Sequence, residues 1–224
     1  MHRAVFCSFL VLAAAAPALA ESEIRKEVRY SVPAAAVREV RIEIPIGEVR
    51  IVNGGGSTID LEGSVSQGYS WRDEREWAET IVAATSIVLE IRGSRALVRR
   101  ELGPEAEGWR AKKSPASIRA VVRVPAGTNV EISQSIGEID VDGAFGDVSV
   151  DLRIGELRLR TRKANVRQLR ASARIGEVEA HLGDRIIRKE GLFAGETLYE
   201  NETGRYFVRL NVKIGEIDVS LIDD

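Results

Sequence analysis

Carboxylates at a repeated spacing are the residues of this sequence with the clearest chemical potential. The tetrapeptide Ile-Gly-Glu-(Val/Ile/Leu) occurs five times, and its glutamates are Glu48, Glu138, Glu156, Glu177 and Glu216. Glutamates stacked side by side repel one another unless they splay apart or bind a cation. Paired carboxylates can also hydrolyse a glycosidic bond. The repeat therefore raises two chemical hypotheses, a cation-binding row and a polysaccharide-cleaving pair.

The other groups that could form a site are few. His181 is the only histidine after residue 20, with Glu179 and Asp184 close to it in the sequence. A metal site needs several converging ligands, so we expect a surface histidine instead. The stretch Asp140-x-Asp142-Gly143 begins like a calcium loop but lacks the remaining ligands. We therefore predict no catalytic residue, no metal site and no cofactor.

Basic residues suggest a binding surface. The segment 153–174 holds eight bases and one acid, and Arg162, Lys163, Arg167 and Arg170 have no acidic neighbour in the stacking that we expect below. These four could bind an anionic envelope polymer such as lipopolysaccharide or an acidic polysaccharide. The alternative is a solvated basic edge that deters edge-to-edge aggregation.

The repeat also predicts geometry. When the copies are aligned on their glycines, apolar residues lie one before, two after and four after each glycine. The apolar positions two and four residues after the glycine are two apart, which fits a strand with one buried face. The apolar positions one before and two after the glycine are three apart, which requires a bend at Gly-Glu. Glycine suits such a bend. We predict corners whose isoleucines point inward and whose glutamates point to solvent. The corner glycines are Gly47, Gly137, Gly146, Gly155, Gly176 and Gly215.

The spacing of the corners is typical of a repeat fold. Gly155 follows Gly137 by 18 residues and Gly176 follows Gly155 by 21, and Gly146 in FGDVSV divides the first interval. We expect an all-β fold, a β-solenoid or roll of short strands, in which Gly137, Gly155 and Gly176 lie one above another on successive windings. The expected neighbours on the outer face are Asp140 with Arg158, Asp142 with Arg160, and Arg158 with Glu179.

The flanking sequence predicts a few further elements. Residues 40–44 and 118–124 alternate like half-buried strands, and residues 87–91 and 96–102 resemble a hairpin around Arg-Gly-Ser. Residues 71–86 have an apolar side formed by Trp77, Ile81 and Val82, which predicts one helix. The helix and hairpin, within about 71–117, form an insertion or a terminal cap beside regular coils at about 118–222.

The N-terminus and the composition suggest export. A basic start, the apolar run 4–16, Pro17 and Ala18-Leu19-Ala20 are typical of a signal peptide, which leaves a single domain from 21 to 224. The only cysteine, Cys7, lies in that apolar run, so no disulfide is expected. We predict no transmembrane segment after cleavage. The remaining 31 bases and 34 acids give a charge of about −3, which argues against a nucleic-acid partner.

The stretch RVPAGTNVEISQSIGEIDVDGAFGDVSVDLRIGELRL resembles a bacterial family of envelope proteins, the "putative adhesin" family. The resemblance rests on a strand ending in VPAG that is followed by repeated Gly-(Asp/Glu)-(Val/Ile) units, and it covers about 118–222. This copy has isoleucine and glutamate where the family often has serine and aspartate. The resemblance implies an exported β-repeat protein and supplies no catalytic residues.

Together these patterns favour an exported, non-enzymatic β-repeat protein, periplasmic or at the cell surface, that binds or acts as a scaffold. Its partner would be an envelope polysaccharide or another envelope protein. The alternatives are a carbohydrate-active enzyme that holds polysaccharide in a solenoid groove, and end-to-end assembly of several chains. The sequence does not determine the oligomeric state.

Overall fold

The computed structural model describes residues 22–54, 56–106, 115–183 and 185–223. The expected signal peptide and Asp184 lie outside these residues. The described chain is mostly β-strand, with one α-helix and two short 3-10 turns. The strands are β1 (Ser22–Pro33), β2 (Glu39–Glu43), β3 (Ile46–Asn53), β4 (Thr58–Tyr69), β5 (Thr85–Arg92), β6 (Arg95–Leu102), β7 (Ser117–Val124), β8 (Asn129–Asp142), β9 (Val148–Arg162), β10 (Val166–Leu182), β11 (Arg185–Glu200) and β12 (Tyr206–Ile222). The helix α1 is Arg72–Ala84, and the 3-10 turns are Pro104–Ala106 and Lys163–Asn165.

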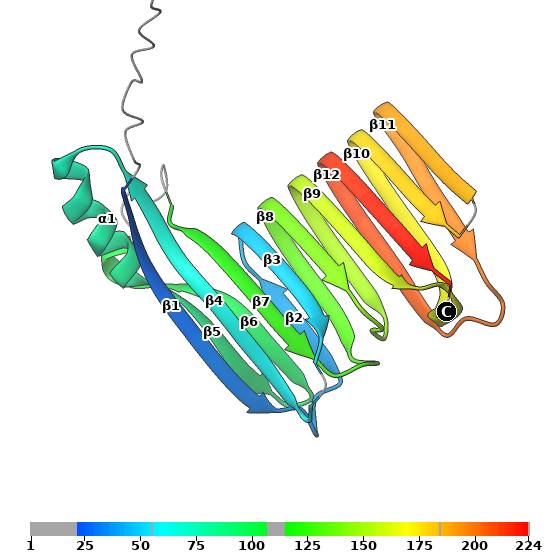
Figure 1. Cartoon of the computed structure of the whole chain (residues 1–224), viewed down its shortest axis with the longest axis horizontal. Helices are drawn as coiled ribbons and strands as arrows, with labels where there is room; N and C mark the ends of the chain where they lie inside the picture. Colours follow the sequence, from blue (N-terminus) through cyan, green and yellow to red (C-terminus); the bar gives the residue numbers. More distant parts are fainter. Residues whose placement is uncertain (1–21, 55, 107–114, 184, 224) are drawn as a thin grey trace, which may run out of the picture.

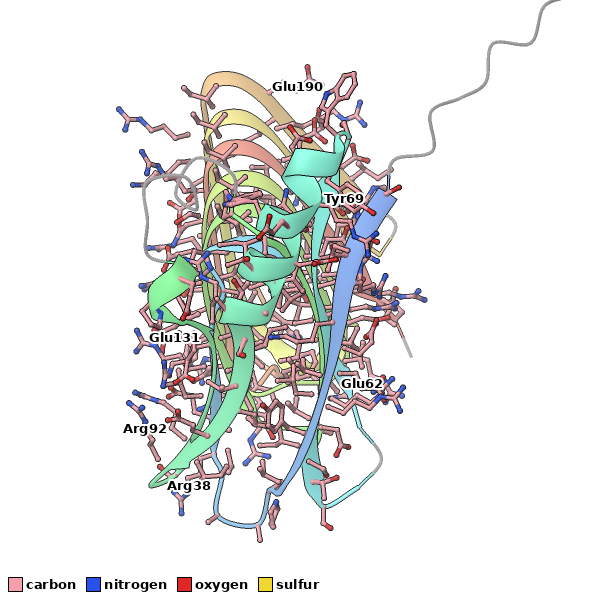
Figure 2. The ribbon with its side chains drawn as sticks, turned by 90° about the vertical axis from the view of Figure 1, so that its left-hand side faces the viewer. Arg38, Glu62, Tyr69, Arg92, Glu131 and Glu190 are labelled. Carbon is pink, nitrogen blue, oxygen red and sulfur yellow. The ribbon has the colours of Figure 1, made fainter. Side chains whose placement is uncertain are left out.

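The strands form one mixed, unclosed sheet whose main order is β1-β4-β7-β3-β8-β9-β12-β10-β11. The sheet divides at β8, which pairs with β2 through residues 129–133 and with β3 through residues 136–142. The first layer contains β5, β6, β2 and the first halves of the long strands. The second layer contains β1, β4, β7, β3 and the second halves of β8, β9, β12 and β10. Figure 2 shows the long strands as nested arches that join the two layers.

The core lies between these layers and is built by alternation along each strand. In β9, Val150 and Leu152 are buried before the bend and Leu157 and Leu159 are buried after it. The same pattern recurs in β8, β12 and β10, because their registers match residue for residue on both sides of the bend. Each strand therefore contributes apolar side chains to the core from two directions.

The corner glycines lie side by side, but in a different order from the one expected. Hydrogen-bonded register places Gly47 beside Gly137, Gly137 beside Gly155, and Gly155 beside Gly215, which in turn neighbours Gly176. The expected adjacency of Gly155 and Gly176 on successive windings is therefore wrong, since β12 lies between β9 and β10. The long strands also continue through the corner, so the expected short strands are not observed.

The backbone explains why these positions are glycine. Gly155 has φ of +138°, and a Cβ built on it would lie 1.8 Å from the carbonyl oxygen of Gly137. Gly146 was expected to belong to the same set. It lies instead in the turn that joins the end of β8 to the start of β9, away from the corner. A Cβ on Gly146 would lie 2.2 Å from the Oδ1 atom of Asn129, so close packing excludes a side chain there too.

Four of the five isoleucines before the glycines point to solvent, so the predicted inward orientation is wrong for them. Ile136, Ile154, Ile175 and Ile214 are 45, 37, 39 and 45% exposed. In β9, the inside of the bend is filled by the residues three before and two after the glycine. The residues between them turn on the outer, convex side, where they have no access to the core.

The outer charges follow the register. Asp140 lies opposite Arg158 and Asp142 opposite Arg160, as expected. The prediction that Arg158 and Glu179 lie side by side is wrong, because Asp218 of β12 occupies the position between them.

Helix α1 covers one end of the stack, against β1, β4 and β5 (Figure 1). Its first turn is capped by the Glu74 carboxylate, which accepts the N–H of Trp71 at 3.3 Å. At its other end the Lys26 ammonium donates to the carbonyl oxygens of Ala83 and Thr85. The expected helix is observed, and the hairpin forms as β5 and β6.

The opposite end of the stack is strand β11 (Figure 1). Lys189 lies opposite the buried Val178, so its side chain also points between the layers, where its ammonium donates to the carbonyl oxygen of Glu196. Ile187 and Tyr199 pack against the core beside it. An inward lysine on an edge strand opposes the pairing of a further strand, so this edge is protected without a helix.

Candidate functional site

Three rows of side chains run along the outside of the glycine corner, because the long strands are in register there. The isoleucine row consists of Ile136, Ile154, Ile214 and Ile175, in the order of β8, β9, β12 and β10. The glutamate row, one residue after each glycine, consists of Glu48, Glu138, Glu156, Glu216 and Glu177. The basic row, two residues before each glycine, consists of Arg153, Lys213 and Arg174.

Arginines from the second layer neutralise most of the glutamate row. The ion pairs are Arg119 with Glu48, Arg158 with Glu138 and Glu156, and Arg188 with Glu177. Across residues 22–223, the described part of the chain has no group of three or more side chains able to hold a metal ion. Arginine therefore offsets part of the repulsion between these stacked carboxylates.

The pair of Glu48 and Arg119 predicts a small dependence of stability on pH. Hydrogen bonding to the guanidinium lowers the pKa of the Glu48 carboxyl. A carboxyl whose pKa is lower in the folded than in the unfolded chain stabilises the fold above its unfolded pKa, and this stabilisation is lost as the pH falls through the folded value. We expect Glu48→Gln to lose well under about 1 kcal/mol at neutral pH, because the pair is half exposed.

Urea unfolding at steps between neutral and acidic pH measures this effect. The difference between wild type and Glu48→Gln should shrink as the pH falls, while Glu76→Gln on α1 should show no such trend. A difference that is constant across the acid range would contradict the assigned pair.

The basic row has no such compensation. Within the described ranges, no acidic side chain pairs with Arg153, Lys213 or Arg174. The three line a groove of about 600 Å³ beside the corner. The other charged residue of this groove is Asp151, whose Oδ1 atom accepts the Asn211 side-chain N–H at 3.0 Å. The groove therefore carries a net positive charge.

A second groove, the phenylalanine groove, lies on the outer face of the first layer and measures about 450 Å³. Phe207 is 50% exposed in it, and the Arg167 guanidinium lies 5.9 Å from the centre of its ring. Arg167 is the extra residue of a β-bulge between β10 and β12, which turns its side chain toward the ring. Arg209, in the next outward position of β12, has no ion pair with a described residue.

The carboxylates of the phenylalanine groove are engaged. Glu39 forms an ion pair with Arg95 at 2.5 Å, and Glu131 forms one with Arg41 at 3.6 Å. The Oδ1 atom of Asp147 accepts the backbone N–H of Phe207 at 2.9 Å. These contacts occupy the three carboxylates, whereas Arg209 has no ion pair with a described residue.

The four basic residues singled out in the sequence do not form one surface. Arg170 lines the phenylalanine groove and pairs with Glu196, and Arg167 stacks on Phe207. Lys163 lies in the 3-10 turn at the end of β9, where it pairs with Asp223 at 3.4 Å. Arg162, at the end of β9, also has a partner. The expectation that Lys163 and Arg170 have no acidic neighbour is wrong, because the C-terminal residues and β11 supply acids.

His181 and Asp140 also have ordinary partners. The Nε2 atom of His181 lies 2.7 Å from the Oε1 atom of Glu179. Glu179 also accepts from Arg188, which lowers the pKa of its carboxyl. Asp140 pairs with Arg50 at 3.3 Å. These contacts describe a polar outer face on the second layer.

Sequence reasoning missed both the basic row and Phe207. The basic row was visible in the alignment of the repeats, since all three residues stand two positions before a glycine. Phe207 had no such signal, because its exposure depends on the pairing of β12 with β10 across a bulge.

No described helix is long and apolar enough to cross a membrane.

No protein-family model matches the chain, and no curated protein matches it. Among solved structures, it is similar to a "putative cell adhesion protein" from Clostridium sporogenes, with 13% identity and a TM-score of 0.45 over 89% of this chain and 100% of that one. It is also similar to "putative adhesins" from Parabacteroides merdae and Bacteroides fragilis. The first has 9% identity and a TM-score of 0.26 over 61% of this chain and 58% of its own. The second has 10% identity and a TM-score of 0.27 over 88% of this chain and 97% of its own.

Proposed function

We propose that this chain is an exported, non-enzymatic β-repeat protein of the cell envelope that binds an acidic polysaccharide in the phenylalanine groove. It would act in the periplasm or at the cell surface, as an adhesin or a scaffold. Its stacked corners would make it a variant of the β-solenoid, with one strand inserted between neighbouring windings.

The observation that carries this proposal is the half-exposed ring of Phe207 beside Arg209, which has no ion pair with a described residue. A sugar ring has a C–H face that packs on an aromatic ring, and its polar groups bind planar polar side chains. A guanidinium favours a carboxylate over a hydroxyl group. A sugar acid is therefore the ligand that suits this pair best.

Three carboxylates in the same groove favour a second candidate, a carbohydrate-active enzyme. Glu39, Glu131 and Asp147 could in principle supply the two carboxyl groups of such an enzyme. A general acid, however, needs a raised pKa and an environment without a neighbouring cation. Two of these groups are paired with arginines and the third binds a backbone N–H, which supports binding over hydrolysis.

Calorimetric titration with an oligogalacturonate tests the proposal, with a neutral cello-oligosaccharide as comparison. We expect the acidic probe to bind more tightly, and Phe207→Ala and Arg209→Ser each to weaken its binding by about tenfold, which is about 1.4 kcal/mol. Tyr30→Ala and Arg29→Ser on β1 are matched controls and should bind normally.

If the Phe207→Ala variant bound the oligogalacturonate as tightly as wild type, the phenylalanine groove would be excluded as the binding site. Release of new reducing ends from the probe, lost in Glu131→Gln, would support the enzyme instead.

Mass spectrometry of the exported chain tests the expected cleavage of the signal peptide, which should leave Glu21 at the N-terminus.

A further inference from the structure

The isoleucine row is an exposed apolar line of unusual regularity. Its four members come from four hydrogen-bonded neighbours, so they follow one another at a spacing of about 4.8 Å. Exposed apolar residues of soluble proteins are normally scattered singly, and a contiguous set marks an interaction surface. The row lies on the convex side of the bend, so all four side chains can touch one flat surface together.

The charges beside the row favour an anionic surface. The basic row flanks it toward the first layer, and its three cations have no acidic partner among the described residues. The glutamate row flanks it toward the second layer, but Arg119, Arg158 and Arg188 neutralise most of its members. The corner therefore presents apolar side chains with three unpaired cations along the side that faces the first layer.

We infer that the glycine corner docks on an anionic lipid bilayer. The isoleucines would enter the boundary between head groups and acyl chains, while Arg153, Lys213 and Arg174 would bind lipid phosphates. Surfaces that lie on a membrane combine these two features, and each basic residue near an anionic surface adds to the attraction. The molecule would then lie with its stack parallel to the membrane.

A second copy of the chain suits this surface less well. In a dimer formed by two facing corners, the basic row of each copy can lie against the glutamate row of the other in only one arrangement. The two stacks are then parallel, and the two-fold axis runs along the isoleucine rows. Four of the five glutamates in each row would then be shared with arginines that already bind them, so the basic rows would gain little free negative charge. A bilayer supplies unpaired phosphates to all three cations.

Co-sedimentation of the exported chain with vesicles tests the inference. The vesicles are phosphatidylcholine mixed with phosphatidylglycerol, compared with phosphatidylcholine alone. We expect wild type to bind the anionic vesicles and to be released by salt. A variant with threonine at the four isoleucines, and a variant with Arg153→Gln, Lys213→Gln and Arg174→Gln, should each lower the partition coefficient by about tenfold or more.

Controls separate this surface from the rest of the molecule. Ile222→Thr and Arg160→Gln remove an exposed isoleucine and an arginine away from the corner and should bind like wild type. Phe207→Ala should also bind vesicles normally, because this inference does not depend on the phenylalanine groove. Normal vesicle binding by the four-threonine variant or by the triple glutamine variant would overturn the membrane-docking inference. A dimer in sedimentation equilibrium that the four-threonine variant abolishes would overturn it in favour of a second copy.

Discussion

Replacing Gly155 by alanine should destabilise the fold by about 2–6 kcal/mol, from about 1–3 kcal/mol of backbone strain and a similar cost of overpacking. Gly155 has φ of +138°, which side chains rarely adopt, and a Cβ would lie 1.8 Å from the carbonyl oxygen of Gly137. That oxygen belongs to the neighbouring strand and cannot move without disturbing the ladder of β8 and β9. Urea unfolding monitored by circular dichroism measures the loss.

Two other glycines separate the causes of this effect. Gly191 has φ of +111° but no atom within 4 Å of a built Cβ, so Gly191→Ala should show the strain without the clash. Gly68 has neither feature, so Gly68→Ala should be close to neutral. If Gly155→Ala were no more destabilising than Gly191→Ala, the close approach of neighbouring corners would be wrong.

Two residues on either side of Gly155 should respond very differently to truncation. Leu157 is fully buried between the layers, so Leu157→Ala should lower the free energy of unfolding by about 2–5 kcal/mol. Ile154 lies on the outside of the bend, so Ile154→Ala should cost less than about 1 kcal/mol. The comparison uses the same strand, the same truncation to alanine and residues of equal carbon number.

The same urea experiment contradicts the assigned orientation if Ile154→Ala proves as costly as Leu157→Ala. That result would return the isoleucines to the core, where the sequence placed them on the assumption that the Gly-Glu bend turns them inward. The membrane-docking surface would then lose its apolar component.

Local pattern was enough to predict much of the fold. The alternation in 40–44 and 118–124, the apolar side of the helix at 71–86 and the hairpin around Arg-Gly-Ser all appear where expected. The identical spacing of residues around each glycine also predicted that the corners share one edge. These features depend on residues close together in the sequence. The pattern of apolar side chains and the conformations open to glycine are therefore sufficient to predict them.

The order of strands and the facing of the isoleucines could not be derived in the same way. The insertion of β12 between β9 and β10 joins residues about 60 positions apart, and the spacing of glycines does not encode it. An apolar residue at a sharp bend can face either side, because the bend interrupts the alternation that assigns a face.

The candidate sites depend on these long-range features. Phe207 and Arg167 meet only because β12 pairs with β10 across a bulge. Lys163 and Arg170 lose their apparent availability because Asp223 and Glu196 come from elements distant in the sequence. Charge counts within one segment therefore gave a misleading set of free cations.

Disulfide trapping between two pairs of engineered cysteines tests the arrangement of the corner most directly. Ile154→Cys with Ile214→Cys joins neighbouring strands, whose backbones lie about 4.8 Å apart, and this pair should cross-link on mild oxidation. Ile154→Cys with Ile175→Cys spans two strand spacings, about 9.6 Å, and should remain reduced. Efficient cross-linking of the second pair and not of the first would contradict the placement of β12 and the single outward row of isoleucines.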